Sequence, residues 1–179
     1  MSTAQSVAGS VASSVASSVA GSGGGVVPDP EMFVNASLAG YVTGSPGTGP
    51  TGWTDGISGT GTVAEPKLTF DCTASRRYIF QAVNLPLGTF QCECVVALNS
   101  GTATIYDLFV ATTGAGQVAT YKVDGVELPY TTAFTGTHTI TITVVVSTAG
   151  SCTFRMGTGC LLARTQNATF GNPSLIQLS

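Results

Sequence analysis

At 179 residues, the chain has the length of one domain with some length left over for an appendage. Hydrophobic residues make up 43% of the sequence and charged residues only 8%, whereas ordinary soluble domains carry roughly 25% charged residues. The net charge of −3 includes no basic stripe of the kind that phosphate contacts need, which argues against nucleic acid as a partner. Such low charge predicts a subunit that hides much of its surface against neighbours.

Residues 1–25 form a tract of low complexity. Within it, valine recurs every four residues, each time followed by alanine: Val7, Val11, Val15 and Val19. A helix would gather these residues on one apolar face, and a strand would place the valines on one side and the alanines on the other. Neither form buries much surface alone. We therefore expect residues 1–22 to be an anchoring or oligomerisation arm ordered by partners, with a disordered tail as the alternative, and 21–25 to be a hinge.

Targeting signals are not evident in the sequence. The first residues lack the basic start and the unbroken apolar run of a secretory signal peptide. No stretch approaches the ~20 apolar residues of a transmembrane helix, so membrane insertion is not expected.

From residue 26 onward, short β-branched and aromatic runs alternate with turns rich in glycine and proline. After a turn-rich loop at 41–56, strands are expected at 67–72, 77–83, 89–98, 103–112, 118–123 and 137–148, followed by shorter ones to the C-terminus. A tight turn is expected at 99–101, and Asp124-Gly125 is the strongest hairpin signal. This pattern, without a helical period, predicts an all-β domain over 26–179: an antiparallel β-sandwich resembling a jelly roll, preceded by the N-terminal arm.

Residues suited to catalysis are few. The single histidine, His138, shares a strand face with Ile140 and Ile142, which favours a packed or edge residue over a base. No second histidine supports a metal site, no G-x-S-x-G motif supports a nucleophile, and the acidic residues show no spacing that fixes a carboxylate pair. The sequence predicts a protein that is not an enzyme and that binds no metal or cofactor.

The five cysteines are odd in number and irregularly spaced: Cys72, Cys92, Cys94, Cys152 and Cys160. A zinc site would need a second pair at ligand spacing, which Cys152 and Cys160 do not provide. We expect free, mostly buried thiols, with a disulfide or metal role as the alternative.

Sugar recognition is harder to dismiss, because a β-sandwich can present an exposed aromatic ring as a stacking platform. The candidates for glycan contact are Trp53, Tyr106, Tyr121 and Tyr130, with Tyr78 as a further aromatic residue. The competing interpretation for each is a core or interface ring. Trp53 follows a Gly/Pro loop and is the first to test, whereas the Arg76–Arg77 pair suggests a subunit contact.

Three short stretches carry a resemblance to a known family: GSPGTGPTGWT (44–54), GTGT (59–62) and TFGNPSLIQL (169–178). They resemble jelly-roll modules in the fibre, tail and capsid-surface proteins of bacteriophage virions, whose sandwiches look like carbohydrate-binding modules. In such modules a short first strand, here 34–38, leads into the Gly/Pro loop and a Gly-Trp. The leader in residues 1–25 is also similar to leaders of phage structural proteins.

This resemblance implies a non-enzymatic structural protein, made in the host cytoplasm and displayed on the virion surface as a capsid decoration, head-fibre or short tail-fibre subunit. Its arm would bind major capsid or tail proteins, and the subunit would be a homo-oligomer, with a trimer favoured. It would stabilise the capsid, adhere to host-surface glycans, or both. The alternative is a receptor-binding, lectin-like module of a tail fibre. No catalytic residues carry over from the family.

Overall fold

The computed structural model describes residues 31–44, 47–58, 62–64 and 68–179. The predicted arm and its valines, Val7, Val11, Val15 and Val19, lie outside the described residues, as does GTG at 59–61.

The described chain is all-β apart from one short helix, and every pairing between its strands is antiparallel. This confirms the predicted fold class. The elements in chain order are β1 (Thr54–Ser58), β2 (Thr62–Ala64), β3 (Leu68–Leu85), β4 (Gly88–Thr104), α1 (Ile105–Leu108), β5 (Phe109–Thr112), β6 (Gln117–Val123), β7 (Val126–Glu127), β8 (Ala133–Val146), β9 (Gly150–Thr158), β10 (Arg164–Phe170) and β11 (Ser174–Gln177).

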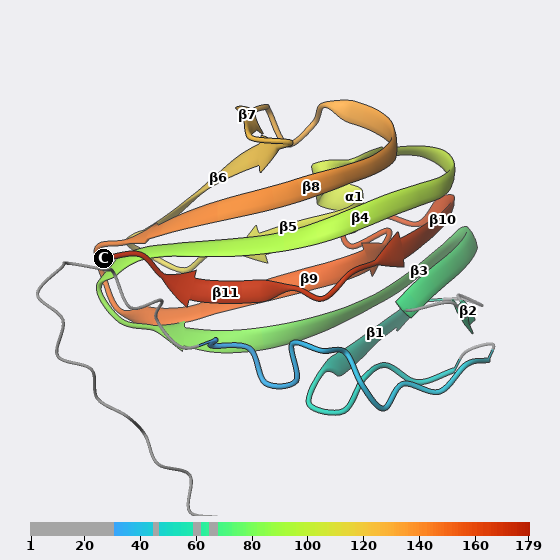
Figure 1. Ribbon diagram of the computed structural model, residues 1–179, viewed down its shortest axis with the longest axis horizontal. Coiled ribbons are helices and arrows are strands. Elements are labelled where there is room, and N and C mark those ends of the chain that lie inside the picture. Colours follow the sequence, from blue (N-terminus) through green and yellow to red (C-terminus); the bar gives the residue numbers. More distant parts are fainter. Residues whose placement is uncertain (1–30, 45–46, 59–61, 65–67) are drawn as a thin grey trace, which may run out of the picture.

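The strands form two layers that share the long strand β3 (Figure 1). The second half of β3 pairs with β1 and β9, and β9 pairs with β5. Its first half pairs with β2 and β10, from which the other layer continues through β4, β8 and β6 to β7. Between the two halves, Ala74 has a φ of 48°, in the left-handed region, where the strand passes from one layer into the other.

The core fills the space between the layers. Alternate residues of β4, β8 and β9 are buried, as the period of two in a strand requires. Across the gap, the Sγ of Cys94 in β4 lies 3.9 Å from the Sδ of Met156 in β9. All five cysteines are buried and free, which agrees with the expectation of unpaired thiols.

Two expected strands differ in the structure. Residues 34–38 form a turn in which Asn35 and Leu38 have positive φ values of 55° and 57°, and the Asn35 amide donates to the carbonyls of Ala39 and Thr51. A strand cannot hold such angles, so the expectation there was wrong. The strands expected at 67–72 and 77–83 are one continuous strand, β3.

The interval 99–112 also departs from expectation. β4 runs through the expected turn at 99–101, where Gly101 (φ 85°) accompanies a shift of register against β8. The strand expected at 103–112 is interrupted by α1. The Asp107 carboxylate accepts hydrogen bonds from the Thr104 amide and hydroxyl and pairs with Arg164, and these contacts fix the helical turn. Asp124-Gly125, with φ values of 51° and 81°, forms the expected turn between β6 and β7.

Candidate functional site

The aromatic residues singled out in the sequence lie in two places. Tyr106, Tyr121 and Tyr130 come together beside β6, and we call these three residues the tyrosine site. Trp53 packs instead with Phe33, whose ring also contacts Phe154 of β9.

Trp53 is a core residue with only 8% of its surface exposed. Its ring centroid lies 5.1 Å from that of Phe33, and its indole N–H donates to the Asn35 carbonyl at 3.2 Å. The ring therefore has no free face for a sugar, and the competing interpretation, a core ring, describes its place in the structure.

The tyrosine site is a stack of rings at the surface. The centroids of Tyr106, in α1, and Tyr130 are 3.8 Å apart with a tilt of 34°, and Tyr121 meets Tyr106 edge-on at 6.3 Å. Tyr121 is buried and donates its hydroxyl to the Ala111 carbonyl of β5 at 3.3 Å. Tyr130 is 42% exposed. The stack thus has a fixed inner ring and an accessible outer ring.

The phenol groups of the inner rings stay protonated near neutral pH. Burial raises the pKa of Tyr121 to about 12, against the smaller opposing effect of its bond to Ala111. Burial, and then a hydrogen bond with the Tyr130 side chain, raises the pKa of Tyr106. Neutral phenols both donate and accept hydrogen bonds, so the site offers apolar rings with polar tips.

A pocket of about 320 Å³ adjoins the tyrosine site along the edge of β6. Its lining comprises Ala119, Thr120, Tyr121, Glu127, Leu128, Pro129 and Tyr130. After β7, the chain separates from β6. The Leu128 amide still donates to the Tyr121 carbonyl of β6, but the next residue, Pro129, has no N–H to continue the pairing. Glu127 is exposed and supplies a carboxylate at the pocket wall.

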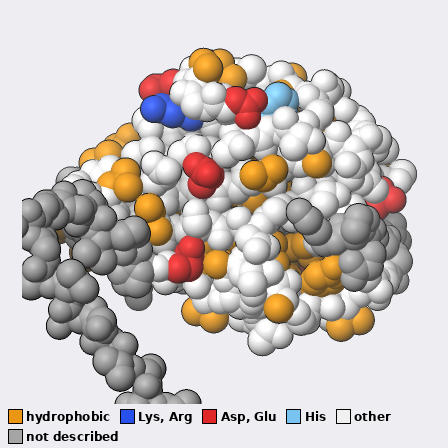
Figure 2. Space-filling model, viewed as in Figure 1, with side chains coloured by type: hydrophobic (Ala, Val, Ile, Leu, Met, Phe, Trp, Pro, Cys, Tyr) orange, Lys and Arg blue, Asp and Glu red, His pale blue; other side chains and the backbone are white. Residues whose placement is uncertain are grey.

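A larger pocket of about 550 Å³ lies between residues 37–41 and strands β4 and β10. No charged side chain of the described residues lines it, and its apolar floor includes Leu68, Val95 and Phe170. The larger pocket therefore has no charged group to orient a ligand. The face shown in Figure 2 carries its acidic, basic and histidine side chains as separate groups among hydrophobic and other polar ones. The smaller pocket combines aromatic rings with an acidic group, so we take it as the candidate site.

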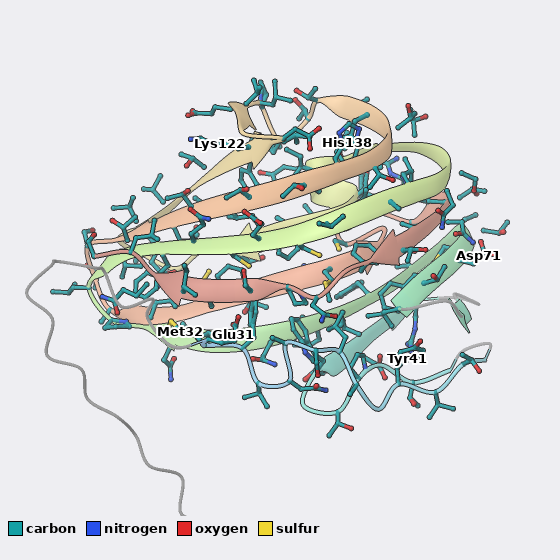
Figure 3. All side chains as sticks on the ribbon, viewed as in Figure 1. Glu31, Met32, Tyr41, Asp71, Lys122 and His138 are labelled. Atoms are coloured by element: carbon teal, nitrogen blue, oxygen red, sulfur yellow. The ribbon has the colours of Figure 1, made fainter. Side chains whose placement is uncertain are left out.

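His138 of β8 contacts the turn between β6 and β7 (Figure 3). Its Nδ1 is 2.6 Å from Oδ2 of Asp124 and its Nε2 is 2.9 Å from the Thr135 carbonyl oxygen. The hydrogen bond with Asp124, followed by that with Thr135, raises the pKa of His138. The same hydrogen bond is the main cause of the lowered pKa of Asp124.

The arginine pair has internal roles. Arg77 is fully buried, pairs with Asp55 at 3.1 Å and donates to the Gly47 carbonyl, so the expected subunit contact is wrong for this residue. Burial lowers the pKa of Arg77 more strongly than Asp55 raises it. Arg76 donates to the carbonyls of Gly159 and Cys160. Among the residues that the structure describes, no group of three or more His, Cys, Asp or Glu side chains is placed to hold a metal ion.

Sequence reasoning found the three tyrosines singly but missed their neighbours Glu127 and Pro129 and the contact between His138 and Asp124. That contact follows from the register of β8 against β6: Val123 pairs with Ile140, so Asp124 comes beside the residues that precede Ile140.

Comparison with protein-family models and with curated proteins gave no match to this chain. In the described part of the chain, no helix has the length and apolar character needed to cross a membrane.

Proposed function

We propose that this protein is a non-enzymatic adhesion subunit displayed on the surface of a bacteriophage virion, where its β-sandwich binds a host-surface glycan. The observation that carries the adhesive role is the stacking of Tyr130 on Tyr106 beside a pocket that also contains Glu127.

The tyrosine site has the chemistry that a sugar ring requires. A pyranose has an apolar face of C–H groups, which packs on an aromatic ring, and a rim of hydroxyl groups, which needs hydrogen-bond partners. Tyr130 supplies the exposed ring, and the Glu127 carboxylate can accept from sugar hydroxyls. Because Tyr106 backs Tyr130 and is held in α1, the ring is positioned before a ligand arrives.

The virion setting is supported by the sequence. The low charge, the valine-containing arm and the resemblance of 44–54 and 169–178 to virion modules agree with a subunit stabilised by neighbours. In this proposal the arm attaches the sandwich to capsid or tail proteins, as a homotrimer. On the head, the subunit would also stabilise the shell, and on the tail it would act in adhesion alone.

The adhesive role is tested by the binding of the purified full chain to extracted host-surface polysaccharide. Tyr130→Ala should abolish binding, and Leu87→Ala, which truncates another exposed apolar side chain in the turn between β3 and β4, should leave it unchanged. Equal binding by both variants, with the fold retained, would refute the tyrosine site.

The virion setting is tested separately by immunogold labelling of intact particles with antibody to residues 26–179. Gold over the heads indicates a capsid decoration or head fibre, and gold on the tail indicates a tail-fibre module. Absence of gold from all particles contradicts the virion setting. Substituting two of the arm valines by Asp should abolish attachment while the sandwich stays folded.

A further inference from the structure

Residues 124–139, which carry Tyr130, lead from the end of β6 into β8, and hydrogen bonds join the two ends of this segment. We call these residues the excursion. The Asp124 amide donates to the Thr139 carbonyl at 2.9 Å, and the Thr139 amide donates to Oδ1 of Asp124 at 2.8 Å. Between these residues, the chain makes β7 and a turn in which the Thr132 amide donates to the Pro129 carbonyl. The position of Tyr130 therefore depends on how firmly residues 124–139 are closed.

His138 closes this excursion with both nitrogens of its ring. The Thr135 carbonyl oxygen can only accept a hydrogen bond, so Nε2 must carry a hydrogen to bond it at 2.9 Å. The Asp124 carboxylate, when ionised, also only accepts, so Nδ1 needs a hydrogen at 2.6 Å. A neutral imidazole has one N–H and satisfies one of these two acceptors. Only the imidazolium satisfies both at once.

The ring of Phe134 links this arrangement to the chain that follows Tyr130. It meets the His138 ring edge-on, with centroids 5.1 Å apart, and it packs partly against the core. Phe134 and Thr135 come only a few residues after Tyr130, so the contacts of His138 restrain the path by which the chain returns from the tyrosine site to β8.

The charges on the neighbouring strands do not compete with Asp124. His138 belongs to the row of alternate residues that includes Ile140, on the core side of β8. The charged residues of the flanking strands β4, β6 and β7 are Glu93, Lys122 and Glu127. Glu93 and Lys122 are register partners of Thr141, and Glu127 is the partner of Lys122, so these three residues belong to the opposite face.

We propose that His138, in its charged form, is the positioning residue of the tyrosine site: it holds the excursion closed so that Tyr130 stacks on Tyr106, and it loosens that stack when it loses its proton. The consequence for sugar binding rests on the proposed function, whereas the consequence for the rings does not.

The direction of the pH effect follows from the contacts. The two hydrogen bonds raise the pKa of His138 above 6.5, its ordinary value, so the closed state is complete below that pH and is lost as the pH rises through the raised pKa. At the acid end, Asp124 keeps its charge until the pH falls below its lowered pKa.

The test is a series of aromatic ¹H–¹³C NMR spectra of the full chain from about pH 5 to about pH 9, which spans the titration of histidine. We expect the Tyr106 and Tyr130 ring signals to shift with the same midpoint as His138, above 6.5. Tyr78, which packs with Arg76 and Arg155 in the other layer, is the internal control and should not follow that midpoint. Tyrosine rings that stay constant while His138 titrates would overturn the proposal.

Two variants sharpen the result. His138→Gln removes the titratable group and should abolish the shift of both rings with pH. Asp124→Asn keeps an oxygen acceptor without its charge and should lower the midpoint of His138, and an unchanged midpoint would contradict the assigned contact. The wild-type series stands alone if either variant fails to fold. Co-titration of the rings without any binding of host polysaccharide would refute the proposed function and leave this inference intact. Polysaccharide binding that is unaffected by pH would overturn the regulatory consequence.

Discussion

The two aromatic clusters of this protein differ in their number of polar atoms and in the exposure of their rings. In the cluster of Phe33, Trp53 and Phe154, the single polar group is the indole N–H, and the Asn35 carbonyl satisfies it inside the protein. The tyrosine site carries three hydroxyl groups, and its outermost ring remains 42% exposed. Rings of similar size thus stabilise the interior in one case and present a surface in the other.

This contrast shows why residue type alone did not separate the two clusters. A ring can enter the core when the chain around it supplies a partner for each polar atom, and the turn at Asn35 does this for the Trp53 indole. Tyr130 follows Pro129 on a segment that leaves the sheet, and it remains 42% exposed. Four predictions test this division, in order of decreasing effect on stability.

The largest effect is expected for Trp53→Ala. Removing a ring that is 8% exposed should lower the free energy of unfolding by about 3–5 kcal/mol, measured by denaturant titration. Below the unfolding transition, the NMR signals of Tyr106 and Tyr130 should remain at their wild-type positions. A loss below about 1 kcal/mol would mean that the ring is not part of the core.

The next effect concerns the buried charge close to Trp53 in the chain. Asp55→Ala removes the carboxylate that pairs with the fully buried Arg77, and the unpaired charge should destabilise the fold by about 3 kcal/mol. The matched control is Asp71→Ala. Asp71 is an exposed acid on β3, the strand that carries Arg77, and its loss should change stability by less than about 0.5 kcal/mol. Equal effects in thermal unfolding would contradict the role of the Arg77 pair.

At the tyrosine site, the same kind of truncation should cost much less. Tyr130→Ala loses a half-exposed ring and its stack on Tyr106, worth about 1 kcal/mol of unfolding free energy. Denaturant titration beside Trp53→Ala checks the difference directly. If Tyr130→Ala were as destabilising as Trp53→Ala, the tyrosine site would be part of the core and not a binding surface.

The smallest effect is the pH dependence supplied by His138 and Asp124. Because the folded pKa of His138 is raised, wild type should be more stable than His138→Gln below about pH 6.5. That advantage should disappear as the pH rises through the folded pKa. Melting temperatures of both proteins across this range give the comparison, and a constant difference between them would exclude a role of protonation.

The sequence allowed the main features of the fold to be predicted because they are local. The Thr/Ile alternation at 137–148 predicts a half-buried strand, and Asp124-Gly125 predicts the hairpin turn, and both occur in the structure. In contrast, α1 depends on Arg164, which reaches Asp107 from a strand distant in sequence. The turn at 34–38 depends on Asn35 bonding to Thr51. Hydrophobic periodicity and secondary-structure propensity are local properties of the sequence, so they do not predict these long-range contacts.

The candidate site follows the same rule. Each tyrosine could be named from the sequence, but their meeting depends on α1, on the path after Pro129 and on β6, which lie in separate stretches. The pairing of His138 with Asp124 depends on the register of β8 against β6. Side-chain type therefore predicts which residues belong to the site but not how they are arranged in space.

The passage of β3 through both layers has a consequence for cooperativity. A strand whose halves pair with β9 on one side and β10 on the other cannot lose one set of partners without straining the other. The sandwich should thus melt in one transition, with equal calorimetric and van't Hoff enthalpies. A single transition means that no half-open form with bare strand edges accumulates, and such edges are the usual route by which sheets aggregate.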